Sequence, residues 1–187
     1  MTTLPTVFIT GASSGIGATY AERFARRGHD LVLVARNKSR LDALAMRLRE
    51  QHQIAVEVLQ ADLTNSAELP ALETRLRHDA RIGILINNAG MPQSGHFLEQ
   101  SPEAIESQIA LNITALTRLA AAIAPRLAQS GTGSIVNIGS VVGFSPEFGI
   151  SLYGATKAYV LYLSQGLAHE LSPKGVYVQA VLPATTR

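Results

Sequence analysis

The sequence contains no cysteine among its 187 residues. This absence excludes disulfide bridges, thiol nucleophiles and cysteine-ligated metal sites, and it fits a cytoplasmic protein. Charge is also sparse, at 16% of residues with a formal net charge of +2, and no basic stripe marks a nucleic-acid partner. No apolar run approaches about 18 residues and no basic region opens the chain, so we expect neither a membrane span nor a signal peptide.

Apolar residues are plentiful, making up 47% of the chain, and the length favours one domain over residues 1–187. Short apolar runs predict strands at 7–9, 30–35, 55–60, 83–87, 134–138 and 176–182. Helical spacing predicts helices at 16–27, 39–50, 66–79, 102–109, 112–129 and 153–171. Short apolar strands that alternate with helices predict an α/β fold, a doubly wound parallel sheet covered on both faces.

A glycine-rich turn follows the first predicted strand, in the stretch TVFITGASSGIG of Thr6–Gly17. Between a strand and a helix, such a turn lets backbone N–H groups cradle a phosphate, because glycine allows close approach. The expected cofactor contacts here are Gly11, Ser13, Ser14, Gly15, Ile16 and Gly17. With Thr10 in front, the spacing is Thr-Gly-x-x-x-Gly-x-Gly.

The same turn leaves a second interpretation open. Gly11-Ala12-Ser13-Ser14-Gly15 also matches the G-x-S-x-G nucleophile elbow of α/β-hydrolases. That site needs an acid and a histidine downstream. The last third of the chain offers only His169, which lies inside a helical pattern, so a serine hydrolase is the weaker alternative.

Ligands of a parallel sheet bind at the carboxyl ends of its strands. Arg36 follows the second strand, where NAD-binding folds usually carry an acidic residue for the ribose 2′-OH. A guanidinium suits a 2′-phosphate, so Arg36, helped by Lys38 or Arg40, favours NADP over NAD. Asp62 follows the third strand and could accept from an adenine amino group or cap the next helix.

Tyr153 and Lys157 stand four residues apart on a predicted helix and so share one face. An ammonium beside a phenol lowers the phenol pKa from about 10, which suits a general acid/base near neutral pH. Ser140 ends the fifth strand, thirteen positions before Tyr153. The segment 141–152 between them must border the group that such an acid/base protonates, and its apolar residues favour an apolar substrate. These residues include Phe144, Pro146, Phe148 and Ile150.

Taken in order, these motifs resemble those of the short-chain dehydrogenase/reductase family. The resemblance is carried by Thr10–Gly17, the Asn-Asn-Ala-Gly string Asn87–Gly90, Asn112, Ser140, Tyr153 and Lys157. It implies a Rossmann-like domain and an NADP-dependent oxidoreductase that interconverts a ketone or aldehyde and an alcohol. A non-catalytic NADP(H)-binding protein with the same fold is the alternative outside enzymes.

The family's pattern also implies residue roles. Tyr153 would donate a proton to the carbonyl, and Lys157 would lower its pKa and hold the nicotinamide ribose. Ser140 would bond the substrate oxygen, and Asn112 would order a water in the proton relay. Further cofactor contacts implied by the family are Asp62, Leu63, Asn88, Ala89, Gly90 and Pro183, whereas Asn87 is expected to be structural. No metal is expected.

The end of the sequence departs from the family. Where the family usually has Pro-Gly and then a threonine near the nicotinamide amide, this sequence reads Pro183-Ala184-Thr185-Thr186-Arg187. The family continues into a substrate-covering segment and another strand. We therefore expect the C-terminal part of the family fold to be absent, cofactor binding to survive in part, and turnover to depend on the missing segment.

Two predicted helices, 112–129 and 153–171, are apolar around nearly their whole circumference. One side of each can face the sheet, and the other needs a partner. We therefore expect a homodimer or homotetramer through these two helices, an association that the family resemblance also implies. A further segment of the same chain that covers them is the alternative.

Overall fold

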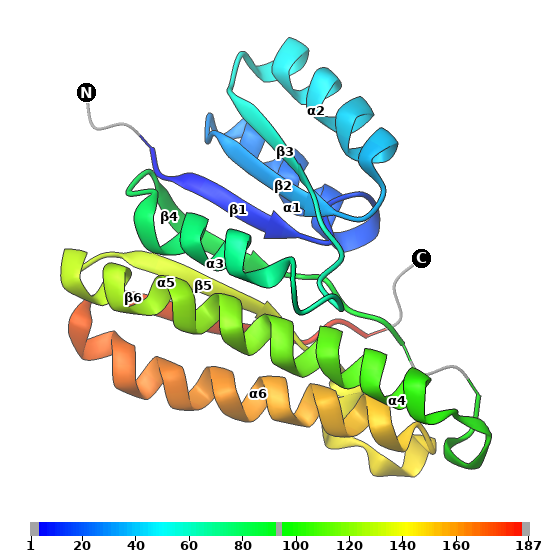
Figure 1. Ribbon diagram of the computed structural model, residues 1–187. Helices are drawn as coiled ribbons and strands as arrows, with labels where there is room; N and C mark the ends of the chain where they lie inside the picture. The colour runs from blue at the N-terminus through cyan, green and yellow to red at the C-terminus, as the bar shows by residue number, and fades with distance from the viewer. Residues whose placement is uncertain (1–3, 93–94, 185–187) are drawn as a thin grey trace.

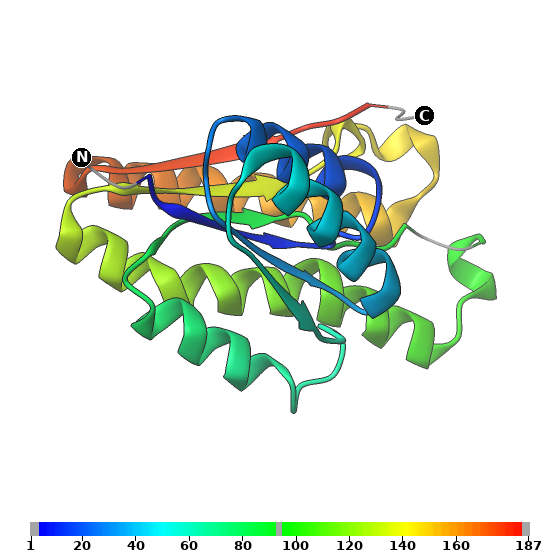
Figure 2. The same ribbon diagram turned by 90° about the horizontal axis from the view of Figure 1, so that it is seen from above.

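The computed structural model describes residues 4–92 and 95–184. Within these residues, six parallel strands form one sheet in the order β3-β2-β1-β4-β5-β6, with helices on both faces (Figures 1 and 2). The strands are β1 Thr6–Thr10, β2 Leu31–Ala35, β3 Val56–Gln60, β4 Ile82–Asn87, β5 Gly133–Ile138 and β6 Val176–Val181. The predicted doubly wound parallel sheet is therefore confirmed.

The main helices follow the predicted order. They are α1 Gly15–Arg26, α2 Lys38–His52, α3 Leu69–His78, α4 Pro102–Ile109, α5 Leu116–Ser130 and α6 Ser151–Leu171. The helix predicted from residue 66 begins later, because Asn65 forms a turn by donating to the Asp62 carbonyl and accepting from the Ala67 amide. Between α4 and α5 the chain remains helical through a π-helical stretch, Ala110–Ala115.

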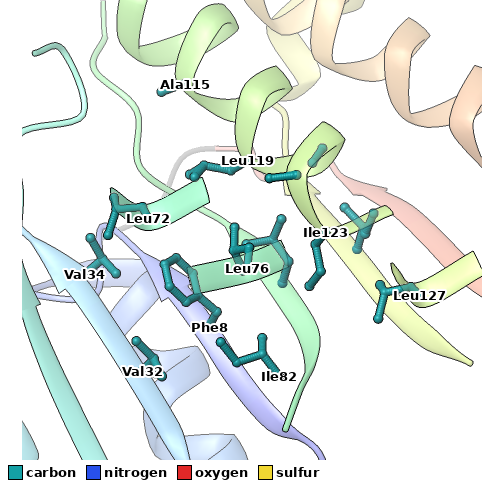
Figure 3. Packing of buried hydrophobic residues seen from close by; sticks show 14 of the residues in the cluster. Phe8, Val32, Val34, Leu72, Leu76, Ile82, Ala115, Leu119, Ile123 and Leu127 are labelled. Atoms are coloured by element: carbon teal, nitrogen blue, oxygen red, sulfur yellow. The ribbon is translucent and has the colours of Figure 1, made fainter. Parts of the chain in front are cut away.

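Apolar side chains fill both faces of the sheet. Phe8 points to the face covered by α3 and α5, where Leu76, Leu119 and Ile123 pack around it (Figure 3). Val7, its neighbour in β1, points to the face covered by α1 and α2. Burying one such side chain contributes about 1.5–3 kcal/mol. The strands are therefore held rigidly, and their carboxyl ends form a fixed edge.

One helical segment is long and apolar enough to cross a membrane, which differs from the expectation drawn from the sequence. It is Pro102–Ser130, with a mean hydropathy of 1.2 in an 18-residue window, half of which is buried inside the fold. Core helices of globular proteins pass the same test of length and composition. Here Leu119, Ile123 and Leu127 are buried in the core, which accounts for the apolar composition.

Candidate active site

A cavity of about 590 Å³ lies at the carboxyl ends of the strands. The predicted site residues that line it are Gly11, Ser13, Ser14, Ile16, Arg36, Asp62, Leu63, Asn88, Ala89, Gly90, Ser140, Tyr153, Lys157 and Pro183. Residues that the sequence reasoning missed are mostly their neighbours, such as Asn37, Met91, Leu111 and Ala184. For most of these residues, the one feature of the sequence that indicates a place in the cavity is a position close to the end of a strand.

The glycine turn is fixed to the end of β4 by hydrogen bonds. Thr10 Oγ1 accepts from the backbone amides of Asn88 and Ala89, both at 3.0 Å. The side-chain amide of Asn88 donates through Nδ2 to the backbone carbonyls of Thr10 and Gly11, at 3.0 and 3.1 Å. The Asn88 side chain therefore shapes the turn as well as lining the cavity.

Gly15 and Gly17, both predicted to contact a cofactor, do not line the cavity. Gly15 has a φ of +55°, a left-handed conformation that favours glycine. A Cβ on Gly17 would lie 2.3 Å from the Gly11 carbonyl oxygen and 2.5 Å from Asn88 Nδ2. Gly17 therefore serves the close packing of α1 against the turn.

We expect Gly17→Ala to lower the free energy of unfolding by about 1–3 kcal/mol, because the added methyl group must displace backbone. Urea denaturation measures this change. Gly166→Ala is the matched control, since a Cβ at that position in α6 meets nothing within 4 Å. This control should leave stability unchanged or raise it, because alanine favours helix over glycine. Equal stability of Gly17→Ala and the unaltered protein would contradict the packing role.

Arg36 and Arg40 line the cavity beyond the end of β2. Asn37 begins α2 by accepting from the Arg40 amide at 3.0 Å, which fixes this corner of the chain. Lys38 instead pairs with Asp42 at 2.6 Å on the helix surface. Of the two proposed helpers of Arg36, only Arg40 therefore faces the cavity.

Asp62 lines the cavity, but its Oδ1 already accepts from the Thr64 amide at 2.9 Å and the Thr64 hydroxyl at 2.7 Å. Burial raises the pKa of Asp62, but these hydrogen bonds and the charge of Arg36 outweigh it and hold the pKa below the usual value. The carboxylate therefore stays ionised and orders the loop after β3.

Lys157 and Tyr153 lie together on α6. The Lys157 ammonium is buried, donates to the Ile138 carbonyl at 2.9 Å, and lies 5.5 Å from the centroid of the Tyr153 ring. Burial lowers the pKa of Lys157 to about 8.

The pKa of Tyr153 differs from the expectation drawn from the sequence. Burial raises the pKa of this phenol above its ordinary value of 10, and its hydrogen bond with Ser140 lowers it only in part. The predicted lowering by Lys157 is therefore wrong for the chain alone. The physical reason is that the ammonium lies over the ring and bonds a carbonyl, and burial weakens its own charged state.

Asn112 is 1% exposed in the π-helical stretch and does not line the cavity. Its side chain accepts from the Met91 amide and donates to the Met91 carbonyl, both at 2.9 Å. It also donates to Thr156 Oγ1 on α6 at 3.2 Å. Asn112 therefore joins the loop after β4 to α6. Asn87, as expected, is buried and structural, and it donates to the Asn137 side chain at 3.0 Å.

The described residues place no histidine where the hydrolase alternative would need its base. His169 is exposed near the C-terminal end of α6, at the opposite end of the sheet from the glycine turn (Figure 1). Among the described residues, no histidine lines the cavity. In the same part of the chain, no group of three histidine, aspartate or glutamate side chains could hold a metal ion.

The segment between Ser140 and α6 forms two short 3₁₀ turns, Val141–Phe144 and Pro146–Phe148. Phe144 and Phe148 are each 62% exposed. This segment therefore presents apolar side chains to solvent directly after Ser140. The threonines discussed for the end of the sequence, Thr185 and Thr186, lie outside the described residues.

Comparison with known proteins identifies the family of this chain. The sequence model for short chain dehydrogenases matches residues 5–187. The chain is 77% identical to a short-chain dehydrogenase from Sphingobium yanoikuyae in complex with NADPH, with a TM-score of 0.98 over 98% of this chain and 72% of that chain. It is 68% identical to the bulky-bulky ketone specific alcohol dehydrogenase from Comamonas testosteroni, with a TM-score of 0.98 over 100% of this chain and 74% of that chain.

Among curated proteins, the chain is 34% identical to very-long-chain 3-oxoacyl-CoA reductase-B of Danio rerio over 94% of its own length, and it spans 57% of that protein. The family match, together with the strand order and the glycine turn, identifies the fold. The chain belongs to the short-chain dehydrogenase family.

Proposed function

We propose that this chain forms the core of an NADP-dependent oxidoreductase that interconverts a ketone or aldehyde and an alcohol. The observation that carries the proposal is the placement of Ser140, Tyr153 and Lys157 in one cavity with the glycine turn and Arg36. The NADPH complex of the Sphingobium yanoikuyae relative supports the choice of cofactor.

The residues present fit NADP. Gly11 lines the cavity, and a Cβ there would lie 2.8 Å from Asn88 Nδ2, so glycine lets the turn pack closely against the end of β4 at the cofactor side. The first amides of α1 suit the diphosphate, and the guanidinium groups of Arg36 and Arg40 suit a 2′-phosphate. Further proposed contacts are Ser13, Ser14, Ile16, Asp62, Leu63, Asn88, Ala89, Gly90, Tyr153, Lys157 and Pro183. When bound, NADPH would supply the hydride.

The chain's own residues would manage the proton. With its raised pKa, the Tyr153 phenol stays protonated at neutral pH and can donate to a carbonyl oxygen. The Ser140 hydroxyl, which is hydrogen-bonded to Tyr153, would form a hydrogen bond with that carbonyl oxygen and keep it beside the phenol. Lys157 would donate hydrogen bonds to the ribose hydroxyls of the cofactor, and Asn112, in the π-helical stretch, would order a water of the proton relay.

The substrate that this site suits is a ketone with bulky apolar substituents. Phe144 and Phe148 lie exposed in the segment that joins Ser140 to α6, and they would cover such groups. The name of the Comamonas testosteroni relative, a bulky-bulky ketone specific alcohol dehydrogenase, supports the same substrate class.

A panel of ketones tests this function. We expect purified full-length protein to oxidise NADPH in the presence of aryl or bicyclic ketones, and to turn over small ketones such as acetone more slowly. Binding of NADPH with no reduction across the panel would instead favour the non-catalytic alternative. Labelling by a fluorophosphonate probe would favour the hydrolase, and we expect none.

We also propose a homodimer or homotetramer in which α5 and α6 meet their counterparts in a second copy. Tyr159 and Thr117 join the two helices by a 3.0 Å hydrogen bond, and Tyr162 beside them is 82% exposed. Pairing the same helices around a two-fold axis would bury this surface in both copies of the chain.

Light scattering of the full-length protein at micromolar concentration tests the assembly. We expect the mass of a dimer or tetramer, and Tyr162→Arg should shift it toward the monomer because the charge would be buried without a partner. Tyr177→Arg, on the exposed face of β6, is the matched control that should leave the mass unchanged. A monomer for the unaltered protein would contradict the proposal.

Cytoplasmic localisation is proposed from the absence of cysteine alone.

A further inference from the structure

A row of buried polar side chains crosses the core beneath the cavity. Asn87 on β4, Asn137 on β5 and Ser164 on α6 are at most 2% exposed. Asn87 donates to Asn137 Oδ1 at 3.0 Å, and Asn137 Nδ2 donates to the Ser164 hydroxyl at 3.0 Å. Burying amide groups is costly unless they are hydrogen-bonded. Even with these hydrogen bonds, Asn87 Oδ1 is buried without a partner among the described residues, so stability alone does not explain the row.

The neighbours of Asn137 do not need it for their hydrogen bonds. Asn87 Nδ2 also donates to the Leu116 carbonyl at 3.2 Å, and the Ser164 hydroxyl donates to the Val160 carbonyl at 2.6 Å. Removing the Asn137 side chain would therefore leave each with another partner. What would be lost is the side-chain link that runs from Asn87 on β4 through Asn137 on β5 to Ser164 on α6.

This link continues directly into the site. Ile138, next to Asn137 in β5, accepts from Lys157 through its carbonyl at 2.9 Å. Lys157 and Ser164 are seven residues apart, two turns of one helix face. Adjacent residues of β5 thus hold α6 at two points, and the same strand leads into Ser140.

We propose that Asn137 is a positioning residue, which fixes α6 on β5 through Ser164 and so sets Lys157 and Tyr153 relative to Ser140. The effect of Asn137 on catalysis rests on the proposed function, whereas its effect on the position of α6 does not. A purely structural asparagine would change stability alone, whereas a positioning asparagine would also change the surroundings of Lys157.

The ionisation of Lys157 reports those surroundings without any cofactor or substrate. The chain has only three lysines, Lys38, Lys157 and Lys174, so protein labelled with ¹³C at lysine Cε gives three signals, and Lys157→Arg assigns the one of interest. Burial lowers the pKa of Lys157 to about 8, and Tyr153 is the titratable group beside it. The pKa of Lys157 measured by an NMR titration therefore reports how completely the packing of α6 on β5 shields this side chain from water.

In Asn137→Leu we expect the titration midpoint of Lys157 to rise by about one pH unit or more, because a loosened α6 admits water. In the full-length enzyme, kcat for ketone reduction should fall about 10- to 100-fold while the NADPH dissociation constant stays within about twofold. Ser164→Ala, which removes one hydroxyl, should act in the same direction. The double variant should be no worse than the more severe single one, because both break one link.

Leu48→Ala is the matched control, since this fully buried residue of α2 lies on the other face of the sheet. It should lower stability and leave the Lys157 midpoint unchanged. An unchanged midpoint in both Asn137→Leu and Ser164→Ala would overturn the inference. Absence of ketone reduction by the unaltered protein would instead refute the proposed function, and the titration would still decide the positioning role.

Discussion

Replacing Tyr153 by phenylalanine should slow ketone reduction by about 10²- to 10⁴-fold, the usual contribution of a general acid. The phenol is the proton donor of the proposed reaction, and its raised pKa keeps it protonated at neutral pH. Phenylalanine preserves the ring that Lys157 lies over, so the packing of the site should survive. NADPH binding, measured by fluorescence titration, should therefore remain nearly unchanged.

Tyr177→Phe is the control for this substitution, since Tyr177 lies 58% exposed on β6 and does not line the cavity. Its turnover should equal that of the unaltered enzyme. Retained turnover in Tyr153→Phe would remove the catalytic assignment, whatever the cofactor affinity.

The double substitution Ala35→Asp with Arg36→Ala should reverse the cofactor preference from NADPH to NADH. A carboxylate at the end of β2 repels a 2′-phosphate and accepts from a 2′-OH, while the lost guanidinium removes a charged hydrogen bond worth about 1.5–3 kcal/mol. We therefore expect the affinity for NADPH to fall at least about tenfold. Isothermal titration with each nucleotide measures the ratio of the two dissociation constants.

Lys38→Ala is the control here, because Lys38 pairs with Asp42 and does not line the cavity. It should leave the preference as it is, whereas Arg40→Ala should weaken NADPH binding. Tighter binding of NADH than of NADPH by the unaltered protein would contradict the role assigned to Arg36.

Much of the fold could be predicted because local sequence and tertiary structure agree. The run Val7–Ile9 is buried on both faces, so it reads as an apolar strand without alternation. The glycine turn after it could be identified because glycines occupy positions that need close approach or a positive φ, as at Gly11. The helix spacing placed Tyr153 and Lys157 together for the same reason, since both lie on one regular helix.

The features that escaped prediction depend on contacts between distant segments. Nothing near Asn112 in sequence indicates that its side chain pairs with the Met91 backbone, or that a π-helical stretch begins at Ala110. The glycine pattern predicts a cofactor contact at Gly17, but it does not show how closely this residue approaches Gly11 and Asn88. Spacing predicts the wrong direction for the pKa of Tyr153, because it shows a neighbouring charge but not the burial of both groups.

In the proposed reaction, hydride passes from NADPH to a ketone carbon, with Tyr153 as proton donor. Mass spectrometry of the alcohol formed from a bulky aryl ketone and NADPH that carries deuterium at both C4 positions tests this reaction. We predict an alcohol that carries one deuterium on the carbinol carbon with the unaltered full-length protein, and almost no alcohol with Tyr153→Phe. Equal alcohol formation by both proteins, or NADPH binding without any labelled alcohol, would contradict the account.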